Sequence, residues 1–335
     1  MHTITFEKTV SMTISVIGSG KIAGEVLGML RTELPDIRPL SIFSHSNIER
    51  AESLAREYGI PHLYTDYGEL LRCDTSDFLY IANVNTAHYA FAMKALEAGR
   101  NVIIEKPLCM TGDEAERLVA TARAKGLMLI EAVSLLHMPN MKSIGAALPL
   151  LGRVRLVECD YSQYSSRYDR YLQGDVAPAF DPQYGGGALR DLNVYNLHFV
   201  VSLFGEPCSV DYHPNVGFNG VDTSGILNLH YRDFECVCSA AKDSWGRPYG
   251  QIQGEKGILR VEGPVNVLSG YELSVCNEKG QLVTTRHNAN TFRHRLAHEF
   301  DAIRKMFEHR DYVAFQHYQD ISLAVMRILQ RVIAP

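Results

Sequence analysis

The stretch TISVIGSGKIAGEVLGML, residues 13–30, decides the fold of this chain. It begins with a β-branched run that is typical of a buried parallel strand, and it ends with apolar residues at helical spacing. Between them, GSGKIA fits the pattern GxGxxA, in which Gly18 and Gly20 are followed by Lys21 and Ile22. Glycines at such a turn let backbone N–H groups approach a pyrophosphate at the helix N-terminus. The stretch therefore predicts a dinucleotide-binding loop, with a plain tight turn as the alternative.

The alternation of strand and helix continues from this loop to about Glu131. Further strand candidates lie at residues 40–43, 78–82, 101–104 and 127–131, with helices between them. Ser46 with Glu49, and Thr111 with Glu114, have the spacing of a capping box and predict two helix starts. This rhythm predicts a doubly wound parallel sheet, so we assign residues 1–131 to an α/β dinucleotide-binding Rossmann domain.

Beyond residue 139 the pattern changes to longer, partly alternating strand candidates. These lie at residues 153–164, 226–240, 257–263 and 271–285, the last with a hairpin turn near Lys279 and Gly280. Helices are expected at residues 188–204, 292–307 and 317–332. We therefore assign residues 132–335 to an α+β domain with a mainly antiparallel open sheet, which binds substrate and mediates oligomerisation. Its last helices are free to pack back on the first domain.

Composition excludes several other classes of protein. Lys and Arg number 33 against 38 Asp and Glu, and the net charge of −5 argues against nucleic acid or an acidic membrane as partner. The longest apolar runs, such as residues 199–204, are too short to span a bilayer. Seven cysteines without a CxxC motif argue against a disulfide framework or a zinc site. Residues 1–11, to which we assign no role, lack the apolar stretch of a signal peptide, so we expect a cytoplasmic protein.

The end of the second strand bears on the choice of cofactor. NAD-binding domains place an acidic residue there to bind the ribose 2′-hydroxyl, but this chain has Ser44, His45 and Ser46. These side chains and Arg50 could instead donate to a 2′-phosphate, which a carboxylate would repel. The serines could also simply cap the next helix. The sequence favours NADP over NAD.

Three further segments join the glycine loop in a family resemblance. NVNTAH (residues 83–88), ALEAGRNVIIEKPL (95–108) and GGGALRDLNVYNLHFVVSLFG (185–205) are similar to the glucose–fructose oxidoreductase/inositol dehydrogenase (Gfo/Idh/MocA) family. Tyr195 stands where inositol dehydrogenases carry histidine, which resembles the dihydrodiol dehydrogenase-like and glucose–fructose oxidoreductase-like branches. The resemblance implies an NAD(P)-dependent oxidoreductase. It also extends the expected cofactor site to further residues, namely Asn83, Asn85, His88, Glu105 and Lys106.

Three residues are candidates for the chemistry. Lys106 follows a parallel strand and so lies at the carboxyl edge of the sheet, where it could donate to a substrate oxygen and favour phenolate on a nearby tyrosine. Asp191 and Tyr195 are four residues apart on one expected helix and therefore share a face. From its pattern alone Tyr195 is a core residue, whereas the resemblance implies an acid/base role. The resemblance also implies a cis peptide bond at Pro107.

Departures from the family pattern limit what can be transferred about the substrate. Asn193 stands where the family usually has glycine, and His198 occupies a position that is often acidic. Arg167 and Tyr168 could bind a polar or anionic substrate, or they could be ordinary residues of a surface loop. His294 and His298 share a helix face but lack an evident third ligand, so we expect no metal. Cys109 follows the EKPL segment and could lie near the site.

These observations predict an oxidoreductase that transfers a hydride between nicotinamide and a carbinol or carbonyl carbon. The resemblance suggests a sugar, polyol or related cyclic alcohol as substrate, with Tyr195 as acid/base, assisted by Lys106 and Asp191. We expect a homodimer or homotetramer formed through the sheet of the second domain. Two alternatives remain open, namely a non-enzymatic dinucleotide sensor and a glycoside hydrolase that retains its NAD.

Overall fold

The computed structural model describes residues 12–333, so the prediction about a signal peptide falls on residues outside it. The first part of the chain forms a six-stranded parallel sheet with the strand order β3-β2-β1-β4-β5-β6. Its strands are β1 (Met12–Ile17), β2 (Ile37–Phe43), β3 (His62–Tyr64), β4 (Phe78–Ile81), β5 (Asn101–Glu105) and β6 (Leu129–Ala132). This order is that of a Rossmann fold, which confirms the predicted doubly wound domain.

Helices connect these parallel strands: α1 (Lys21–Glu33), α2 (Ile48–Tyr58), α3 (Tyr67–Cys73), α4 (His88–Glu97) after the 3₁₀ turn η1 (Asn85–Ala87), and α5 (Gly112–Lys125). The capping box predicted at Thr111 and Glu114 is present. The box predicted at Ser46 is wrong, because Asn47 caps α2 and accepts from the backbone N–H of Arg50 at 3.2 Å. Ser46 lies one residue too early to reach that amide.

The second part of the chain forms an eight-stranded sheet with the order β14-β13-β12-β11-β7-β10-β9-β8. The strands are β7 (Val154–Ser162), β8 (Ser209–Val216), β9 (Asp222–His230), β10 (Glu235–Ala241), β11 (Tyr249–Gly254), β12 (Gly257–Glu262), β13 (Tyr271–Cys276) and β14 (Leu282–His287). Only β7 and β10 pair in parallel, so the predicted mainly antiparallel sheet is confirmed.

One strand prediction in this domain is wrong. Residues 226–240 form two antiparallel strands, β9 and β10, rather than one long strand. The chain reverses between them, where the amide of Tyr231 donates to the carbonyl of Phe234 at 3.1 Å. The polar pair Arg232 and Asp233 supplies this turn, and the apolar residues on either side hid it in the pattern. β8 and β11 were not predicted.

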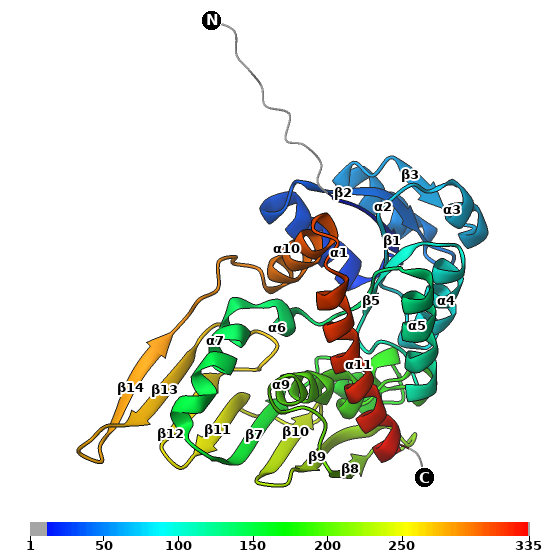
Figure 1. Ribbon diagram of the computed structural model, residues 1–335. Coiled ribbons are helices and arrows are strands. Elements are labelled where there is room, and N and C mark those ends of the chain that lie inside the picture. The colour runs from blue at the N-terminus through cyan, green and yellow to red at the C-terminus, as the bar shows by residue number, and fades with distance from the viewer. Residues whose placement is uncertain (1–11, 334–335) are drawn as a thin grey trace, which may run out of the picture.

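Helices cover the face of the eight-stranded sheet that is turned toward the first domain (Figure 1). Among them are α7 (Pro139–Ala147), α9 (Val194–Phe204) and α11 (Tyr312–Ile333). The other helices of this part of the chain are α6 (Ser134–His137), α8 (Tyr168–Leu172) and α10 (Arg295–Glu308). Short turns accompany them: η2 (Leu148–Leu151), η3 (Pro178–Phe180), η4 (Pro182–Tyr184) and the π-helix η5 (Leu189–Asn193), which leads directly into α9.

Two hydrophobic cores hold the domains together. In one, side chains of α11 such as Val325 pack with Leu118 of α5 and Val200 of α9, so a single core spans both sheets. In the other, α10 packs on the first domain, where the ring of Phe300 lies 5.5 Å from that of Tyr80 in an edge-to-face contact. The two sheets are therefore joined by buried apolar surface.

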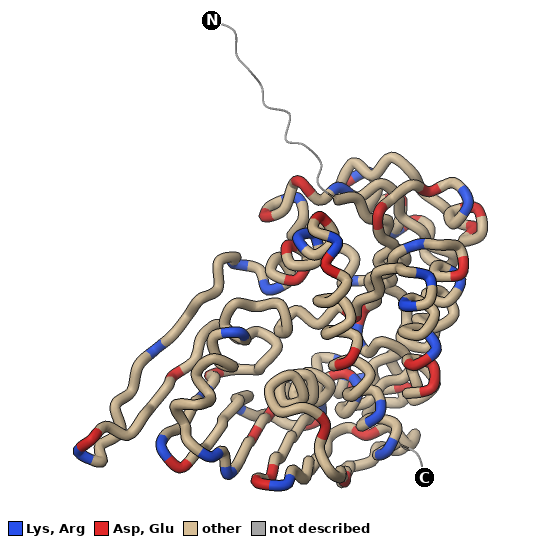
Figure 2. Tube along the Cα trace, in the orientation of Figure 1, with Lys and Arg blue, Asp and Glu red and all other residues tan. Residues whose placement is uncertain are grey.

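Charge is distributed over the whole molecule. Figure 2 shows Lys and Arg interspersed with Asp and Glu on both domains, in keeping with the small net charge. The outer face of the eight-stranded sheet is mixed: half-buried Leu156 and Ile258 lie on it, and Gln251 and Gln253 there both donate to the carboxylate of Glu158. This is the face through which we expect the chain to associate.

Candidate active site

The glycine loop is shaped for the close approach of a ligand. Gly18 has φ = +123°, and a Cβ there would lie 2.6 Å from the carbonyl oxygen of Ala82. Gly20 is the N-cap of α1 and offers no side-chain hydrogen bond, so the first amides of the helix remain available to an anion. A cavity of about 630 Å³ opens beside the loop. It is lined by Gly18, Ser19, Gly20, Lys21, Ile22, Phe43, Ser44, His45, Ser46, Asn47, Ala82, Asn83, Val84, Ala87 and Phe91.

The end of β2 lies in this cavity without a carboxylate. Ser44 is buried and its hydroxyl accepts from the amide of Asn47 at 3.2 Å, while the exposed His45 and Ser46 face the opening. The guanidinium of Arg50 lies against Gly24 of α1, and Arg50 is not among the residues that line the cavity. The Ser-His-Ser segment is therefore placed to contact a cofactor, and Arg50 lies beside it.

Two buried side chains, those of His88 and Glu131, hold the segment after β5 in place. His88 places Nδ1 2.8 Å from the carbonyl oxygen of Pro107 and Nε2 3.3 Å from that of Asn83, and the Lys106–Pro107 peptide bond is cis. Burial lowers the pKa of His88, which favours its neutral form. The imidazole thus supports the loops and does not line a cavity. Glu131 accepts from the amide of Leu108 at 2.8 Å.

A buried acid faces His198 of α9. His198 lies with Nε2 3.3 Å from the carboxylate of Glu131, and both side chains are at most 1% exposed. Glu131 belongs to β6. This pair ties the loop after β5 to α9.

Lys106 and Asp191 meet, although 85 residues separate them in sequence. The ammonium of Lys106 donates to Asp191 twice, to Oδ1 at 2.9 Å and to the main-chain carbonyl at 3.0 Å. Its nitrogen also lies 5.0 Å from the centre of the Tyr195 ring. Asp191 belongs to the π-helix η5 and Tyr195 to α9, so the single α-helix expected here begins with a wider turn. Such π segments are frequent at functional sites.

A second lysine, which sequence reasoning missed, completes this cluster. Lys242 follows β10 directly, is only 3% exposed, and donates to Asp191 Oδ2 at 2.9 Å. The sequence held a clue to this role, because a lysine that directly follows the apolar strand end Ala240-Ala241 is a charge that needs a buried partner. Its partner was not evident because 51 residues separate Lys242 from Asp191.

Burial and the two lysines set the protonation of the cluster. Burial by itself would raise the pKa of Asp191, but the ammonium groups of Lys106 and Lys242 hold that pKa below its ordinary value. Burial would lower the pKa of Lys106, whereas Asp191 and Tyr195 raise it, so Lys106 stays charged. Burial raises the pKa of Tyr195, and Lys106 opposes this without overcoming it. Lys106 therefore acts on this pKa in the expected direction, although burial keeps the pKa above its ordinary value.

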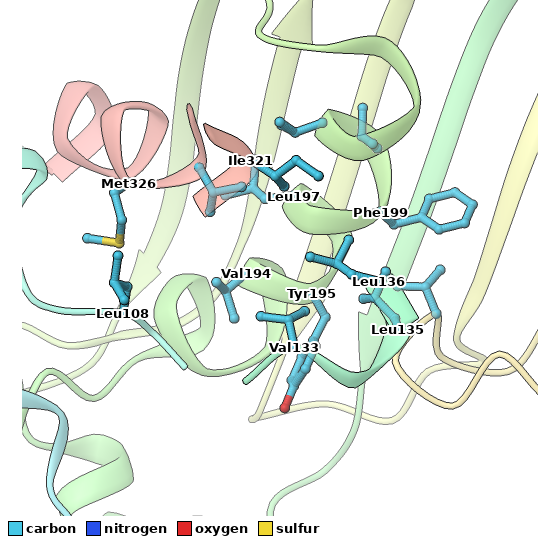
Figure 3. Close-up of a cluster of buried hydrophobic side chains, with 14 of the residues drawn as sticks. Leu108, Val133, Leu135, Leu136, Val194, Tyr195, Leu197, Phe199, Ile321 and Met326 are labelled. Atoms are coloured by element: carbon cyan, nitrogen blue, oxygen red, sulfur yellow. The ribbon is translucent and has the colours of Figure 1, made fainter. Parts of the chain in front are cut away.

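Lys106, Asp191 and Tyr195 face a second cavity, of about 340 Å³. It is lined by Lys21, Ile22, Glu25, Asn83, Asn85, Glu105, Lys106, Ala132, Arg167, Asp191, Tyr195, Arg295 and Leu296. Figure 3 shows the ring of Tyr195 running out of a cluster of buried apolar side chains, with its hydroxyl at the far end. Because Lys21, Ile22 and Asn83 line both cavities, the two spaces adjoin.

The remaining candidate residues divide between this cavity and other places. Arg167 lines the cavity, as does Arg295, whose guanidinium donates to the hydroxyl of Ser134 at 2.9 Å and which the sequence did not single out. Tyr168 instead packs in an aromatic cluster, 5.8 Å from the ring of Phe180. Glu105 accepts from the hydroxyl of Tyr80 at 2.5 Å.

Two sequence features turn out to have local structural roles. His294 caps α10 through the amide of Leu296, and His298 is buried with its ring 5.2 Å from that of Phe292. Within residues 12–333 no three His, Cys, Asp or Glu side chains are grouped so as to hold a metal ion. Cys109 is fully buried, with Sγ 3.2 Å from the carbonyl oxygen of Thr111, and lines neither cavity.

Comparison with known families finds two matching models. The model described as "Oxidoreductase family, NAD-binding Rossmann fold" matches residues 12–133, and the "GFO/IDH/MocA C-terminal domain" matches residues 150–260. Together they cover more than half of the chain, including the six-stranded sheet and strands β7 to β11 of the eight-stranded one. Within the part of the chain that the structure describes, no helix is long and apolar enough to cross a membrane.

Individual proteins resemble the chain over most of its length. A scyllo-inositol 2-dehydrogenase (NADP⁺), IolU of Bacillus subtilis, is 33% identical over 248 residues, which cover 74% of this chain and 75% of that one. A trans-1,2-dihydrobenzene-1,2-diol dehydrogenase of Xenopus tropicalis is 29% identical over 252 residues, 73% and 74% of the two chains. The crystal structure of KijD10, a 3-ketoreductase from Actinomadura kijaniata in complex with NADP and TDP-benzene, superposes with a TM-score of 0.81. It is 22% identical over 96% of this chain and 97% of that one, and this likeness shows the shared fold.

Proposed function

Because this chain belongs to the Gfo/Idh/MocA family of NAD(P)-dependent oxidoreductases, we propose that it interconverts the carbinol and carbonyl forms of a sugar, polyol or related cyclic alcohol. The names of its relatives, an inositol dehydrogenase and a dihydrodiol dehydrogenase, support a cyclic alcohol as substrate. One observation carries the proposal: Lys106, Asp191 and Tyr195 line a cavity that adjoins the glycine-loop cavity.

The residues present fit a dinucleotide. The close approach of Gly18 to Ala82 leaves no room for a side chain, and the uncapped start of α1 presents amides to a diphosphate. In our proposal Gly18, Gly20, Lys21 and Ile22 hold the diphosphate. The nicotinamide half extends into the second cavity, past a set of polar residues formed by Asn83, Asn85, Glu105 and Lys106. When bound, the cofactor accepts or donates the hydride.

We further propose that the cofactor is NADP. The cavity beside the glycine loop, which holds the adenosine half of the cofactor in this proposal, is lined by no Asp or Glu. Ser44, His45 and Ser46 stand where a 2′-phosphate requires hydrogen-bond donors. The alternative, NAD, would need the 2′-hydroxyl to be bound without the usual carboxylate. Titration with each nucleotide distinguishes them.

Tyr195 moves the proton in this proposal. Its phenolate takes the proton of the substrate alcohol during oxidation, and the resulting phenol returns that proton to the carbonyl oxygen during reduction. Lys106 has three N–H donors, of which Asp191 accepts two, so the third is free to point at the substrate oxygen. Both carboxylate oxygens of Asp191 are bonded to lysines, which suits it to positioning Lys106 rather than to acting as a base.

The test is a turnover assay. Sugars, polyols and cyclic diols are offered with NADP⁺ or NAD⁺, and their ketones with the reduced nucleotides, while the absorbance of the reduced nicotinamide is followed. Turnover of one of these alcohols supports the proposal. Tight nucleotide binding without turnover of any alcohol, ketone or glycoside indicates the sensor alternative. Cleavage of glycosides without net change in absorbance indicates the hydrolase.

A further inference from the structure

The turn that carries Asp191 is tied to one strand, β10. The side-chain amide of Asn193 donates to the carbonyl of Cys238 at 3.0 Å, and that of Asn196 donates to the carbonyl of Ser239 at 3.1 Å. Lys242, just past the end of the same strand, bonds Asp191 itself. The geometry of Asp191 in this chain thus depends on β10.

The ammonium group of Lys242 is engaged in contacts within the protein, and Lys242 does not line the substrate cavity. Its ammonium donates to the carbonyl of Ala179 at 2.5 Å as well as to Asp191 Oδ2, and it lies 4.6 Å from the centre of the Phe180 ring. At 3% exposure, and absent from the lining of either cavity, Lys242 can affect a reaction only through Asp191 or through its charge.

The balance of charge in the cluster is the decisive feature. Lys106 and Asp191 alone would form a pair without net charge. With Lys242 on the second oxygen, two ammonium groups share one carboxylate, and the cluster carries a net positive charge when Lys242 is protonated. Burial lowers the pKa of Lys242, and Asp191 opposes this. A lysine is costly to bury unless it is paired, and here the carboxylate it pairs with is already paired. A surplus positive charge is thereby buried in a cluster whose Lys106 ammonium lies 5.0 Å from the centre of the Tyr195 ring.

We propose that Lys242 is a positioning residue: it holds one oxygen of Asp191 so that the other fixes Lys106, and its charge favours the phenolate form of Tyr195. This inference rests on the proposed function. The other groups that face the phenol from packed elements are Glu105 of β5, Arg295 of α10 and Tyr161 of β7, which remain the same in each variant below.

The experiment compares two substitutions of opposite charge. In the oxidative direction the phenolate is the active form, so kcat rises with pH through the apparent pKa of Tyr195. Lys242→Met removes a positive charge, and we expect this limb to move up by about one pH unit. Asp191→Asn removes a negative charge, and we expect the limb to move down. Lys242→Arg keeps the charge and should restore the position of the limb, while Lys256→Met, an exposed lysine of the same domain, should leave it unchanged.

A merely structural role would not produce shifts of opposite sign. Both substitutions would then lower kcat or the melting temperature while the limb stayed in place, and that result overturns the inference. Profiles are measured with deuterium-labelled substrate, so that the isotope effect shows where hydride transfer limits the rate. Affinity for NADP should stay unchanged in Lys242→Met, because Lys242 lines neither cavity.

Failure of this inference is separable from failure of the proposed function. If Tyr195→Phe keeps wild-type turnover and profile, the acid/base assignment falls, and the role of Lys242 falls with it. If Tyr195→Phe loses turnover while Lys242→Met keeps the wild-type limb, only the role of Lys242 is overturned. Should Lys242→Met not fold, Lys242→Gln takes its place, because it removes the same charge, and a limb that stays in place refutes the charge argument.

Discussion

Replacing Lys106 by alanine tests the proposed chemistry most directly. The ammonium lies 5.0 Å from the centre of the Tyr195 ring. At an effective dielectric constant near 20, a charge at that distance contributes about 3 kcal/mol, or roughly two pKa units, in favour of the phenolate. Without it, the phenolate fraction near neutral pH should fall by about 10²-fold, and loss of the donor to the substrate oxygen should reduce kcat further.

The assay measures kcat against pH for wild type, Lys106→Ala, Tyr195→Phe and the double variant. Because both residues serve one proton transfer, we expect the double variant to lose less than the product of the single losses. Nucleotide titration by fluorescence should show affinity largely retained, since the glycine loop is untouched. Lys125→Ala is the matched control, because this exposed lysine only bonds the carbonyl of Glu97.

Two results would refute this reasoning. Tyr195→Phe with near-wild-type kcat, under conditions where hydride transfer limits the rate, would show that the tyrosine is only a core residue. A double variant whose loss equals the product of the single losses would show that Lys106 and Tyr195 act in separate steps.

The remaining predictions concern the cofactor, stability and assembly. Gly18→Ala places a methyl group 2.6 Å from a carbonyl oxygen at a residue with positive φ, so it should abolish nucleotide binding. The control Gly59→Ala has no atom within 4 Å of the added methyl group and should cost only about 1 kcal/mol of unfolding free energy. Equal effects of the two substitutions on nucleotide binding would contradict this prediction. Ser44→Asp should weaken NADP far more than NAD in titrations, and wild type that binds NAD more tightly would refute our reading of this loop. Burial raises the pKa of Asp74, but hydrogen bonds from three serines and Arg100 outweigh burial and hold that pKa below its ordinary value. The ionised Asp74 carboxylate therefore stabilises the folded protein fully above about pH 4, and this stabilisation is lost as the pH falls through the lowered pKa. The difference in unfolding free energy between wild type and Asp74→Asn should accordingly shrink in acid, and a constant difference would argue against this account. Light scattering should show a homodimer or homotetramer, and a monomer at micromolar concentration would rule out association through the outer face of the sheet.

The sequence alone determined the first domain and one half of the candidate site. Strand and helix periods are local properties, so the alternation up to Glu131 and the GxGxxA turn could be read directly. The placement of Lys106 also followed, because a residue just after a parallel strand must lie at the carboxyl edge of the sheet. The capping box at Thr111 was equally local, and it is present.

Local patterns also misled where several arrangements satisfy them equally well. Ser46 and Asn47 are both good N-caps, and only the path of the chain from β2 decides that Asn47 starts the helix. Apolar residues on both sides of Arg232 and Asp233 concealed a hairpin, because a buried sheet accepts one long strand as readily as two short ones.

The tertiary structure alone decided the electrostatics of the site. Asp191 meets Lys106 across 85 residues and Lys242 across 51, and no periodicity in the sequence specifies such pairs. They arise because the parallel pairing of β7 with β10 brings the end of β10 under the turn before α9, while the shared core sets that turn against β5. Burial then gives these few charges their influence, since charges interact strongly only where water is excluded.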